Sequence, residues 1–457
     1  MTTSLFGENY LITSQSGLEI YREIEHLPII DPHNHADVKE IAENKNYTDL
    51  WQIEGATDHY VWELLRKRGI PESHITGNAS NEEKWLAAAS VWEELIGNPT
   101  YEWVSLDLRR ILGIEDPINA QTARSIWEKS KIALAQPGMK PQNLLRQMNV
   151  EVMCSTDDPT FTLEHHQALQ NSPIANMVRP TFRPDRAMHI FKPDWKEYIT
   201  DFENFMNTRF NHIRDLIQAL QARHDYFAEN GCLASDHGVE VPYAYQVEEE
   251  DANAAFRKAY EGKALSQQET IAYMSYVLNE VAEMDAQKGW VFQLHLGVKR
   301  DVRASLYETI GVDSGGDISR NDLPIVDPLI PLLNRFDDRL KIVLYCIDPT
   351  HQPTLATLTR AFGPKVNLGS AWWFNDTPVG MKNQLEYIAT VDLLSNFAGM
   401  VSDSRKLFSY ASRHEMFRRC LADVLGKLVD QGRAPLSAAI RLAQRIAYRQ
   451  VKEFWGF

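Results

Sequence analysis

The sequence lacks several features that would define common classes of protein. Its four cysteines are scattered and form no CxxC pair, so neither a disulfide framework nor a structural zinc site is indicated. No apolar run reaches the roughly 18 residues that a membrane-spanning helix needs. Residues 1–17 contain no basic segment followed by an apolar one, which is the pattern of a secretory signal. These absences predict a cytoplasmic protein that does not associate with a membrane.

An excess of positive charge is also missing. The chain carries 47 Lys and Arg against 62 Asp and Glu, a net charge of -15, which argues against nucleic acid and anionic membranes as partners. If the substrate is a small anion, its site must gather positive charge locally against this background. The acidic composition leaves room for a homo-oligomer without indicating one.

What is present is an alternation of short β-rich segments with helical patterns along 457 residues. Eight such segments occur, at 27–35, 150–158, 177–185, 232–237, 290–295, 341–348, 366–370 and 398–403. The alternation predicts an α/β protein with a (β/α)8 TIM-type barrel. An open doubly wound sheet is the alternative, but no Gly-rich phosphate-binding turn follows any of the segments.

The stretch between the first two β-rich segments contains only helical patterns. Gly stops and Asp, Asn or Thr starts mark several of them. We therefore predict three parts: residues 1–35 with an N-terminal helix and the first barrel strand, 36–148 as a large helical insertion or lid subdomain, and 149–457 as the remainder of the barrel. Within the last part, 194–228 and 248–286 are each predicted as one long helical region.

Two histidines at the end of the first strand indicate a metal site. His33 and His35 are two positions apart, and in extended chain such side chains point to the same face. Asp403 ends the last predicted strand, which adjoins the first when a barrel closes, and is the best third ligand. Two imidazoles and one carboxylate leave open the positions that a catalytic metal requires. Two histidines at a turn, and a helix N-cap at Asp403, are the alternatives from the residues alone.

Further side chains fall where other predicted strands end, and such ends converge on one rim of a barrel. Arg405 suits binding of a carbonyl or enediolate oxygen, and Arg183 suits a substrate carboxylate. His295 would be a further ligand or a donor to the substrate. Ordinary ion pairs and a core histidine are the alternatives for these three residues.

Aromatic residues supply the last candidates. His59 and Tyr60 begin an insertion helix, and a phenol beside an imidazole can move protons if a lid brings both over the rim. A helix cap with two half-buried rings is the alternative. Trp372 and Trp373 could form an apolar wall for a sugar ring or belong to the core.

These residues lie in motifs that resemble the uronate (glucuronate) isomerases of the amidohydrolase superfamily. The similarity runs nearly end to end. It is carried by DPHNH at 31–35, DHYVW at 58–62, IGNP at 96–99, CSTDDP at 154–159, FRPD at 182–185, GCLASDH at 231–237, LYC at 344–346, GSAWWFND at 369–376, SDSR at 402–405 and RHE at 413–415.

The resemblance implies a metal-dependent aldose–ketose isomerase that interconverts D-glucuronate with D-fructuronate and D-galacturonate with D-tagaturonate. It implies one divalent metal ion, with zinc the first to test, held by His33, His35 and Asp403. The superfamily's two-metal pattern is incomplete here, which favours a single ion.

The resemblance also assigns roles to the remaining candidates. The residues implied around the reacting carbons are His59, Tyr60, His295, Asp403 and Arg405. Arg183 would meet the substrate carboxylate. Trp372, Trp373 and Asp348 are also taken as substrate-binding, although Asp348 stands where related chains carry an amide.

Two other functions compete with the isomerase. One is a metal-dependent hydrolase of a lactone, ester or amide, because the superfamily scaffold mostly activates water. The other is a sugar-acid binding protein without catalysis, which would have no need of an open metal position. The sequence leaves undecided the preferred uronate, the metal loaded, the oligomeric state and whether Tyr60 or Asp403 takes the C2 proton.

Overall fold

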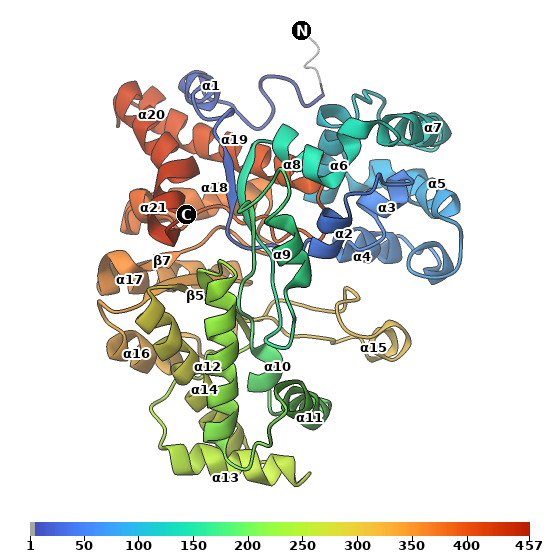
Figure 1. Ribbon diagram of the computed structural model, residues 1–457. Helices are drawn as coiled ribbons and strands as arrows, with labels where there is room; N and C mark the ends of the chain where they lie inside the picture. The colour runs from blue at the N-terminus through green and yellow to red at the C-terminus, as the bar shows by residue number, and fades with distance from the viewer. Residues whose placement is uncertain (1–4) are drawn as a thin grey trace.

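The computed structural model describes residues 5–457, and Figure 1 shows its strands surrounded by helices. Seven parallel strands form two sheets, so the predicted α/β class is confirmed. The first sheet has the order β1 (Ile29–Asp31), β2 (Val150–Cys154), β3 (Val178–Arg179). The second has the order β4 (Ala234–Val239), β5 (Val291–Leu296), β6 (Lys341–Cys346), β7 (Val366–Leu368).

Phe182 connects the two sheets. It forms isolated parallel bridges with Asp157 on one side and Ser235 on the other. Its backbone N–H donates to the carbonyl of Ala234 at 3.1 Å, and its carbonyl accepts from the N–H of Asp236 at 3.0 Å. The seven strands therefore stand side by side in chain order. Pro180 lacks an N–H, which explains why β3 ends so early.

The prediction of an eighth regular strand at 398–403 was wrong: within residues 5–457 this segment is irregular and belongs to neither sheet. It still lies between β7 and the chain that follows β1, because Ala398 N donates to Leu368 O at 3.0 Å and Asp403 N donates to His33 O at 3.2 Å. Left-handed backbone at Gly399 (φ 112°) and Asp403 (φ 50°) interrupts the strand geometry.

The insertion contains helices and no strand across 36–148, all of which the structure describes. Its helices are α2 (Val38–Glu43), α3 (Leu50–Glu54), α4 (His59–Lys67), α5 (Asn81–Val91), α6 (Pro99–Arg110), α7 (Ala123–Leu134) and α8 (Pro141–Gln147). They share a hydrophobic core that includes Trp85, Trp92 and Trp127. Sequence patterns missed α2, which is only six residues long.

The other helices lie outside the insertion, most of them around the sheets. They are α1 (Gln15–Arg22), α9 (Glu164–Leu169), α10 (Asp185–Met188), α11 (Trp195–Met206), α12 (Ile213–Glu229), α13 (Glu249–Tyr260), α14 (Gln267–Lys288), α15 (Ala304–Ile310), α16 (Val326–Arg335), α17 (Gln352–Phe362), α18 (Pro378–Val391), α19 (Ser409–Asp430), α20 (Leu436–Gln444) and α21 (Gln450–Trp455).

Each of the two long helical regions predicted in this part is split into two helices. Asn207 is left-handed (φ 50°) and ends α11, and a capping box of His212 and Asp215 starts α12. Similarly, Gly262 has φ 78° after α13, and Ser266 with Glu269 forms the capping box of α14. In both cases the local capping chemistry outweighs the continuous helical periodicity.

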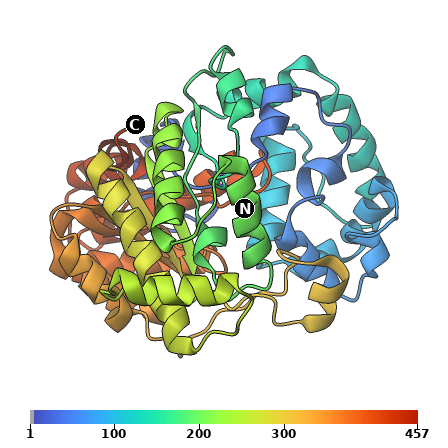
Figure 2. The ribbon, with the colours of Figure 1, turned by 60° about the horizontal axis from the view of Figure 1, so that its bottom comes forward.

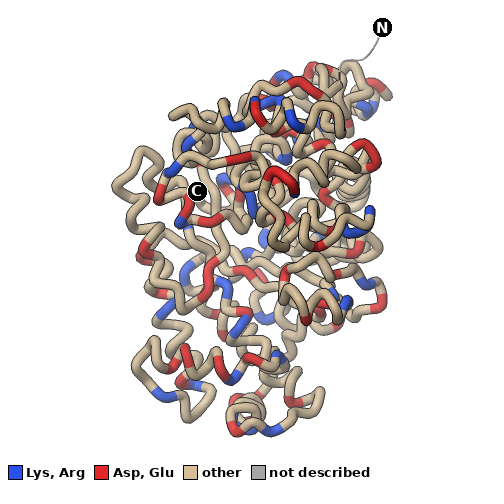
Figure 3. The backbone as a smooth tube through the Cα atoms, turned by 90° about the vertical axis from the view of Figure 1, so that its right-hand side faces the viewer, with Lys and Arg blue, Asp and Glu red and all other residues tan. Residues whose placement is uncertain are grey.

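Figure 2 shows the insertion to one side of the helices around the second sheet, with α15 beside it. The loop that carries α15 reaches α4, because Arg66 donates to the carbonyl of Ser314. No helix among residues 5–457 is long and apolar enough to cross a membrane. Acidic and basic residues are interspersed along the backbone in Figure 3, so the net negative charge is not confined to one tract.

Candidate active site

A cavity of about 370 Å³ opens where the parallel strands end. Most of the residues predicted from the sequence line it. The lining consists of His33, His35, Asp37, Thr57, His59, Arg183, His295, Arg300, Asp313, Trp372, Trp373, Asp403 and Arg405. They come from segments far apart in the chain, and the strand ends and the insertion both contribute.

His33, His35 and Asp403 form the most compact cluster. Oδ1 of Asp403 lies 3.1 Å from His33 Nε2 and 3.2 Å from His35 Nε2. The ligand atoms of the three residues lie within 4.8 Å of one another, so one cation could contact them all. Two imidazole nitrogens and a carboxylate oxygen are ligand types that zinc and similar divalent ions accept. The residues present therefore fit the implied metal.

Backbone conformation explains how this cluster forms. β1 ends at Asp31, so the two histidines project from extended chain just beyond the strand. Asp403 adopts the left-handed conformation, which Asp tolerates better than most residues. Asp31, at the end of β1, accepts a hydrogen bond from Ser402 N, next to Asp403, at 2.9 Å. The ends of the first and last segments are thereby held together.

Asp236, in β4, connects this cluster to a second group of side chains. Its carboxylate lies 2.6 Å from His295 Nδ1, 3.0 Å from Arg183 Nη1 and 3.5 Å from His33 Nδ1. His33 Nδ1, His295 Nε2 and Asp236 Oδ2 are buried without a hydrogen-bond partner among residues 5–457. Sequence analysis assigned Asp236 no role, although its place in a strand that ends at the cavity rim was a usable signal.

The electrostatics of the cluster favour charged carboxylates. Burial alone would raise the pKa of Asp403, but hydrogen bonds with His33 and His35 hold it well below its usual value. Burial would likewise raise the pKa of Asp236, but Arg183, His295 and His33 hold it well below. Burial lowers the pKa of His35 to about 4, so this imidazole is neutral at pH 7 and able to bind a cation.

The insertion contributes His59 and, more remotely, Tyr60. The His59 ring lines the cavity and lies 5.0 Å from the Trp373 ring between centroids. Tyr60 stacks on His59, but its hydroxyl donates to Asp376 at 2.8 Å, and it is outside the set of described residues that line the cavity. Asp376 in turn accepts from Arg413 at 3.1 Å. Burial raises the pKa of Asp376 to about 6, although Arg413 opposes the rise.

A buried ionic cluster fastens the insertion to the chain that carries Asp403. Lys406 lies 2.7 Å from Glu54 in α3 and 3.3 Å from Asp58, the N-cap of α4. Burial would lower the pKa of Lys406, but these carboxylates and Asp107 raise it, so the ammonium is retained. Because Asp58 immediately precedes His59, this cluster fixes the place where α4 enters the site.

Three arginines reach the cavity, and two of them share a carboxylate. Arg183 is engaged by Asp185 at 2.8 Å and by Asp236 at 3.0 Å. Arg405 and Arg300 both approach Asp313, at 3.2 Å and 3.4 Å. Sequence analysis missed Arg300 and Asp313, because both belong to the loop after β5 rather than to a strand end.

The remaining predicted residues occupy different surroundings. Trp372 and Trp373 line the cavity, and Trp372 Nε1 donates to Asp403 Oδ2 at 2.8 Å. Asp348 lies outside the described lining of this cavity, and its carboxylate accepts from Thr350 N at 2.9 Å as a helix cap. Its substrate contact therefore remains a prediction.

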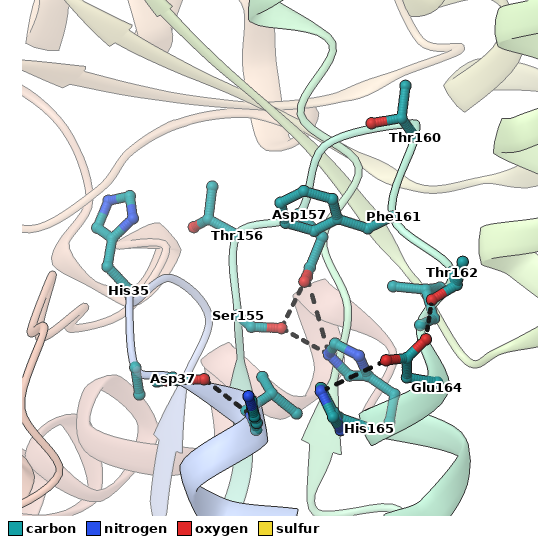
Figure 4. A pocket seen from close by; sticks show the side chains of 15 residues that line it. His35, Asp37, Ser155, Thr156, Asp157, Thr160, Phe161, Thr162, Glu164 and His165 are labelled. Carbon is teal, nitrogen blue, oxygen red and sulfur yellow. Dashed lines mark hydrogen bonds and ion pairs between the residues drawn. The ribbon is translucent and has the colours of Figure 1, made fainter. Parts of the chain in front are cut away.

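Figure 4 shows a second cavity, of about 470 Å³, near the first. His35 and Asp37 line both cavities. Within the second cavity, Ser155 Oγ lies 2.7 Å from Asp157 Oδ2 and 2.8 Å from His166 Nε2. Burial raises the pKa of Asp157 to about 7. This carboxyl has hydroxyl and amide donors. His166 Nε2 lies 3.8 Å from Asp157 Oδ2, but burial lowers the pKa of His166 to about 4, so the imidazole is neutral at pH 7.

The fold and the first cavity define an α/β protein with a candidate divalent-metal centre at the carboxyl ends of its parallel strands. A family model described as glucuronate isomerase matches residues 1–455. The chain belongs to the glucuronate isomerase family, and the resemblance found in the sequence is confirmed.

Individual relatives agree with this assignment over almost the whole chain. A uronate isomerase of Thermotoga maritima is 48% identical over 442 residues, which cover 97% of each chain. The solved structure of the uronate isomerase from Thermotoga maritima gives a TM-score of 0.97 at 47% identity, covering 99% of this chain and 100% of that one. The glucuronate isomerase from Caulobacter crescentus gives 0.94 at 27% identity, covering 99% and 97%.

Proposed function

We propose that this chain is an aldose–ketose isomerase of hexuronates, which moves a proton between C2 and C1 through an enediolate. D-glucuronate with D-fructuronate, and D-galacturonate with D-tagaturonate, are the expected pairs. The observation that carries the proposal is the meeting of the His33–His35–Asp403 cluster with three arginines in one cavity of a chain from this family. An anionic sugar and an anionic intermediate both need such local positive charge.

The architecture that we infer around this site is a closed (β/α)8 barrel covered by the 36–148 insertion as a lid subdomain, between parts 1–35 and 149–457. The bonds of segment 398–404 to both β7 and the chain after β1 support closure, since His35 N also donates to Ser404 O at 2.9 Å. Most apolar side chains of the insertion helices belong to one hydrophobic cluster, which also includes residues of β1, β2 and β3, whereas most of the barrel helices pack in another cluster. This packing supports the division between the two parts.

His33, His35 and Asp403 would hold one divalent ion, and zinc is the first to test. When bound, the ion would supply fixed positive charge that stabilises negative charge on substrate oxygens. The chain itself adds the guanidinium of Arg405, which lines the same cavity as Asp403, and a permanently charged planar donor would stabilise an enediolate in the same way.

Binding and ring opening fall to the other lining residues. Arg183 would meet the substrate carboxylate, His295 would offer Nε2 to a hydroxyl, and the Trp372–Trp373 wall would contact the sugar ring. Asp403, with help from His59, would move the proton of the anomeric hydroxyl when the ring opens. Because the pKa of Asp403 is held below its usual value, this group is an ionised carboxylate at neutral pH and can accept that hydroxyl proton.

Tyr60 and Asp403 are the two candidates for moving the C2 proton. Burial and Asp376 raise the pKa of Tyr60 well above its usual value, so the phenol is protonated at neutral pH. Tyr60 would therefore take the C2 proton only after passing its own proton to Asp376, to which its hydroxyl donates. Washout of the C2 hydrogen of D-glucuronate into D2O separates the two candidates in Tyr60→Phe and Asp403→Asn variants. Undiminished washout in either variant would remove that residue from the proton-transfer role.

The decisive experiment is an assay of D-glucuronate and D-galacturonate conversion with metal analysis of the same preparation. We expect ketose formation that disappears on chelation and returns with zinc. Release of acid from a lactone, ester or amide without any ketose would replace the proposal with the hydrolase.

We also infer that the enzyme is cytoplasmic, and its four buried free cysteines support this localisation. Sedimentation would establish its oligomeric state.

A further inference from the structure

One carboxylate in the cavity already sits where an anionic ligand would bind. Asp313, in the loop after β5, has Oδ2 3.2 Å from Arg405 Nη2 and Oδ1 3.4 Å from Arg300 Nη1. All three residues line the cavity. A single carboxylate therefore spans two guanidinium groups that face the space available to the substrate.

The pairing of these arginines differs from that of Arg183. Asp236, which holds Arg183, is fully buried, so its release would leave an uncompensated buried charge. The side chain of Asp313 is 45% exposed, and the side chains of Arg300 and Arg405 are 35% and 28% exposed. A half-exposed carboxylate regains water when it leaves its partners, so its exchange costs little.

The loop can keep its structure when the Asp313 carboxylate leaves the two arginines. Its base is closed by reciprocal backbone hydrogen bonds of 3.0 Å between Lys299 and Ile318. Buried Asp317 holds Arg300 at 2.9 Å and accepts from Asp301 N at 2.8 Å. Arg300 therefore keeps its place when Asp313 moves.

We propose that Asp313 is a resident counter-ion, which occupies the Arg300–Arg405 pair in the free enzyme and yields it to an anionic group of the hexuronate. This inference rests on the proposed function and adds a determinant of specificity to it. The carboxylate of the hexuronate replaces the lost charge of Asp313 at the arginines, so in this proposal Arg300 and Arg405 meet that carboxylate together with Arg183. A neutral aldose offers no such replacement, so the exchange selects for acid sugars.

The test is a binding measurement that needs no turnover. D-glucarate carries the anionic group but cannot isomerise, and D-glucitol is the matched neutral ligand. We expect Asp313→Asn to bind D-glucarate about tenfold more tightly than the wild type in calorimetry, because no anion has to be displaced. Binding of D-glucitol should stay within twofold, and both kcat and KM for D-glucuronate should fall as the anionic product leaves more slowly.

Two controls keep the result specific. Asp322→Asn makes the same change of charge at a carboxylate that pairs with Arg320 outside the cavity, and it should leave both affinities unchanged. Asp313→Ser repeats the test without the amide. An unchanged D-glucarate affinity in both Asp313 variants, or an equal gain for D-glucitol, would overturn the counter-ion role. Wild-type turnover of D-glucuronate is measured separately, so a failure of the proposed function is distinguished from a failure of this inference.

Discussion

Charged residues are buried on two sides of the cavity, and the two sides use them differently. On the strand side, His33, His295 and Asp236 keep buried polar atoms that have no hydrogen-bond partner within residues 5–457. On the insertion side, Lys406 bonds to Glu54 at 2.7 Å and lies 3.3 Å from Asp58. Glu54 Oε1 and Asp58 Oδ2 also lack a hydrogen-bond partner, and Asp236 Oδ2 is paired with Arg183, so the difference lies in what the groups face. The imidazoles of His33 and His295 line the cavity, whereas Lys406 is enclosed by the protein's own carboxylates.

The two groups therefore have different roles: the first is suited to binding and catalysis, and the second holds the insertion in place. Unpartnered polar atoms are costly in a folded protein and persist where a ligand completes them. A lysine enclosed by carboxylates holds segments in place but has little left for a substrate. We therefore expect loss of function on the strand side without loss of fold, and loss of fold on the insertion side with the metal cluster intact.

The largest effect should come from Asp403→Asn. Its carboxylate contacts both His33 and His35, so we expect kcat/KM for D-glucuronate to fall by about 1,000-fold or more, and bound metal to fall with it. The urea midpoint of the metal-free protein should change little, because Asp236 still faces His33 and the new amide keeps an oxygen beside both rings. Trp372→Phe removes the hydrogen bond to Oδ2 and shortens the ring that packs on His295, but it leaves the carboxylate and both histidines in place. It is the control for metal content and should keep its metal. Full metal content in Asp403→Asn would contradict its role as a ligand.

Lys406→Met should reverse this pattern. It leaves Glu54 and Asp58 without their buried cation, so we expect unfolding to become easier by about 3–5 kcal/mol in urea titrations. The folded fraction should still bind metal at wild-type stoichiometry. Lys427→Met is the control, because Lys427 is 40% exposed beside Asp423 and should matter by less than about 1 kcal/mol. Equal losses in both variants would mean that the buried cluster does not fasten the insertion.

The sequence revealed the strand side better than the insertion side. His33, His35 and Asp403 were predictable because parallel strand ends converge whatever their distance along the chain. Lys406 and Glu54 were not predictable, because their pairing depends on how α3 packs against a loop 352 residues away. Arg300 and Asp313 were not predicted from the sequence for a related reason: they lie in an irregular loop with no periodic signal.

Secondary structure shows the same limit on a smaller scale. The starts of the seven strands were predicted to within two residues, but β1, β2 and β3 end four to six residues before the predicted segments do. The segment 398–403 was predicted as a strand from its apolar residues, but Gly399 and Asp403 take left-handed backbone there. That departure brings Asp403 to the histidines, so the local pattern fails where function requires it.

Tyr60→Phe tests whether a residue of the insertion takes part in proton transfer. Tyr60 belongs to the insertion, and its hydroxyl bonds to Asp376 rather than lining the cavity. If the phenol moves a proton, kcat should fall by about 100-fold with metal content and KM little changed. A structural role would instead lower stability and leave kcat within a few-fold, so parallel kinetics and urea titrations decide between the two roles.

The smallest effect concerns Asp157, a buried carboxyl beside the second cavity that has no cation of its own. Burial raises its pKa to about 7, from an ordinary value of 3.8. The folded protein therefore holds a proton that the unfolded chain has lost, and the contribution of Asp157 to stability should fall as the pH rises from about 4 to 7. The Asp157→Asn variant does not lose stability in this way. Its unfolding free energy minus that of the wild type should therefore rise by about 2–3 kcal/mol between pH 5 and pH 8.

His166→Gln supplies a comparison of opposite sign. Burial lowers the pKa of His166 from 6.5 to about 4, so at pH 5 the unfolded chain binds a proton that the folded protein does not. The unfolding free energy of His166→Gln relative to wild type should therefore fall by about 2 kcal/mol between pH 5 and pH 8. Urea titrations at the two pH values measure both variants.

A difference between Asp157→Asn and wild type that is the same at pH 5 and pH 8 would contradict the prediction for Asp157. It would show that Ser155 and the Thr181 N–H stabilise the carboxylate as fully as water does. Asp157 would then resemble Asp236 on the strand side, whose buried charge is supported by its neighbours.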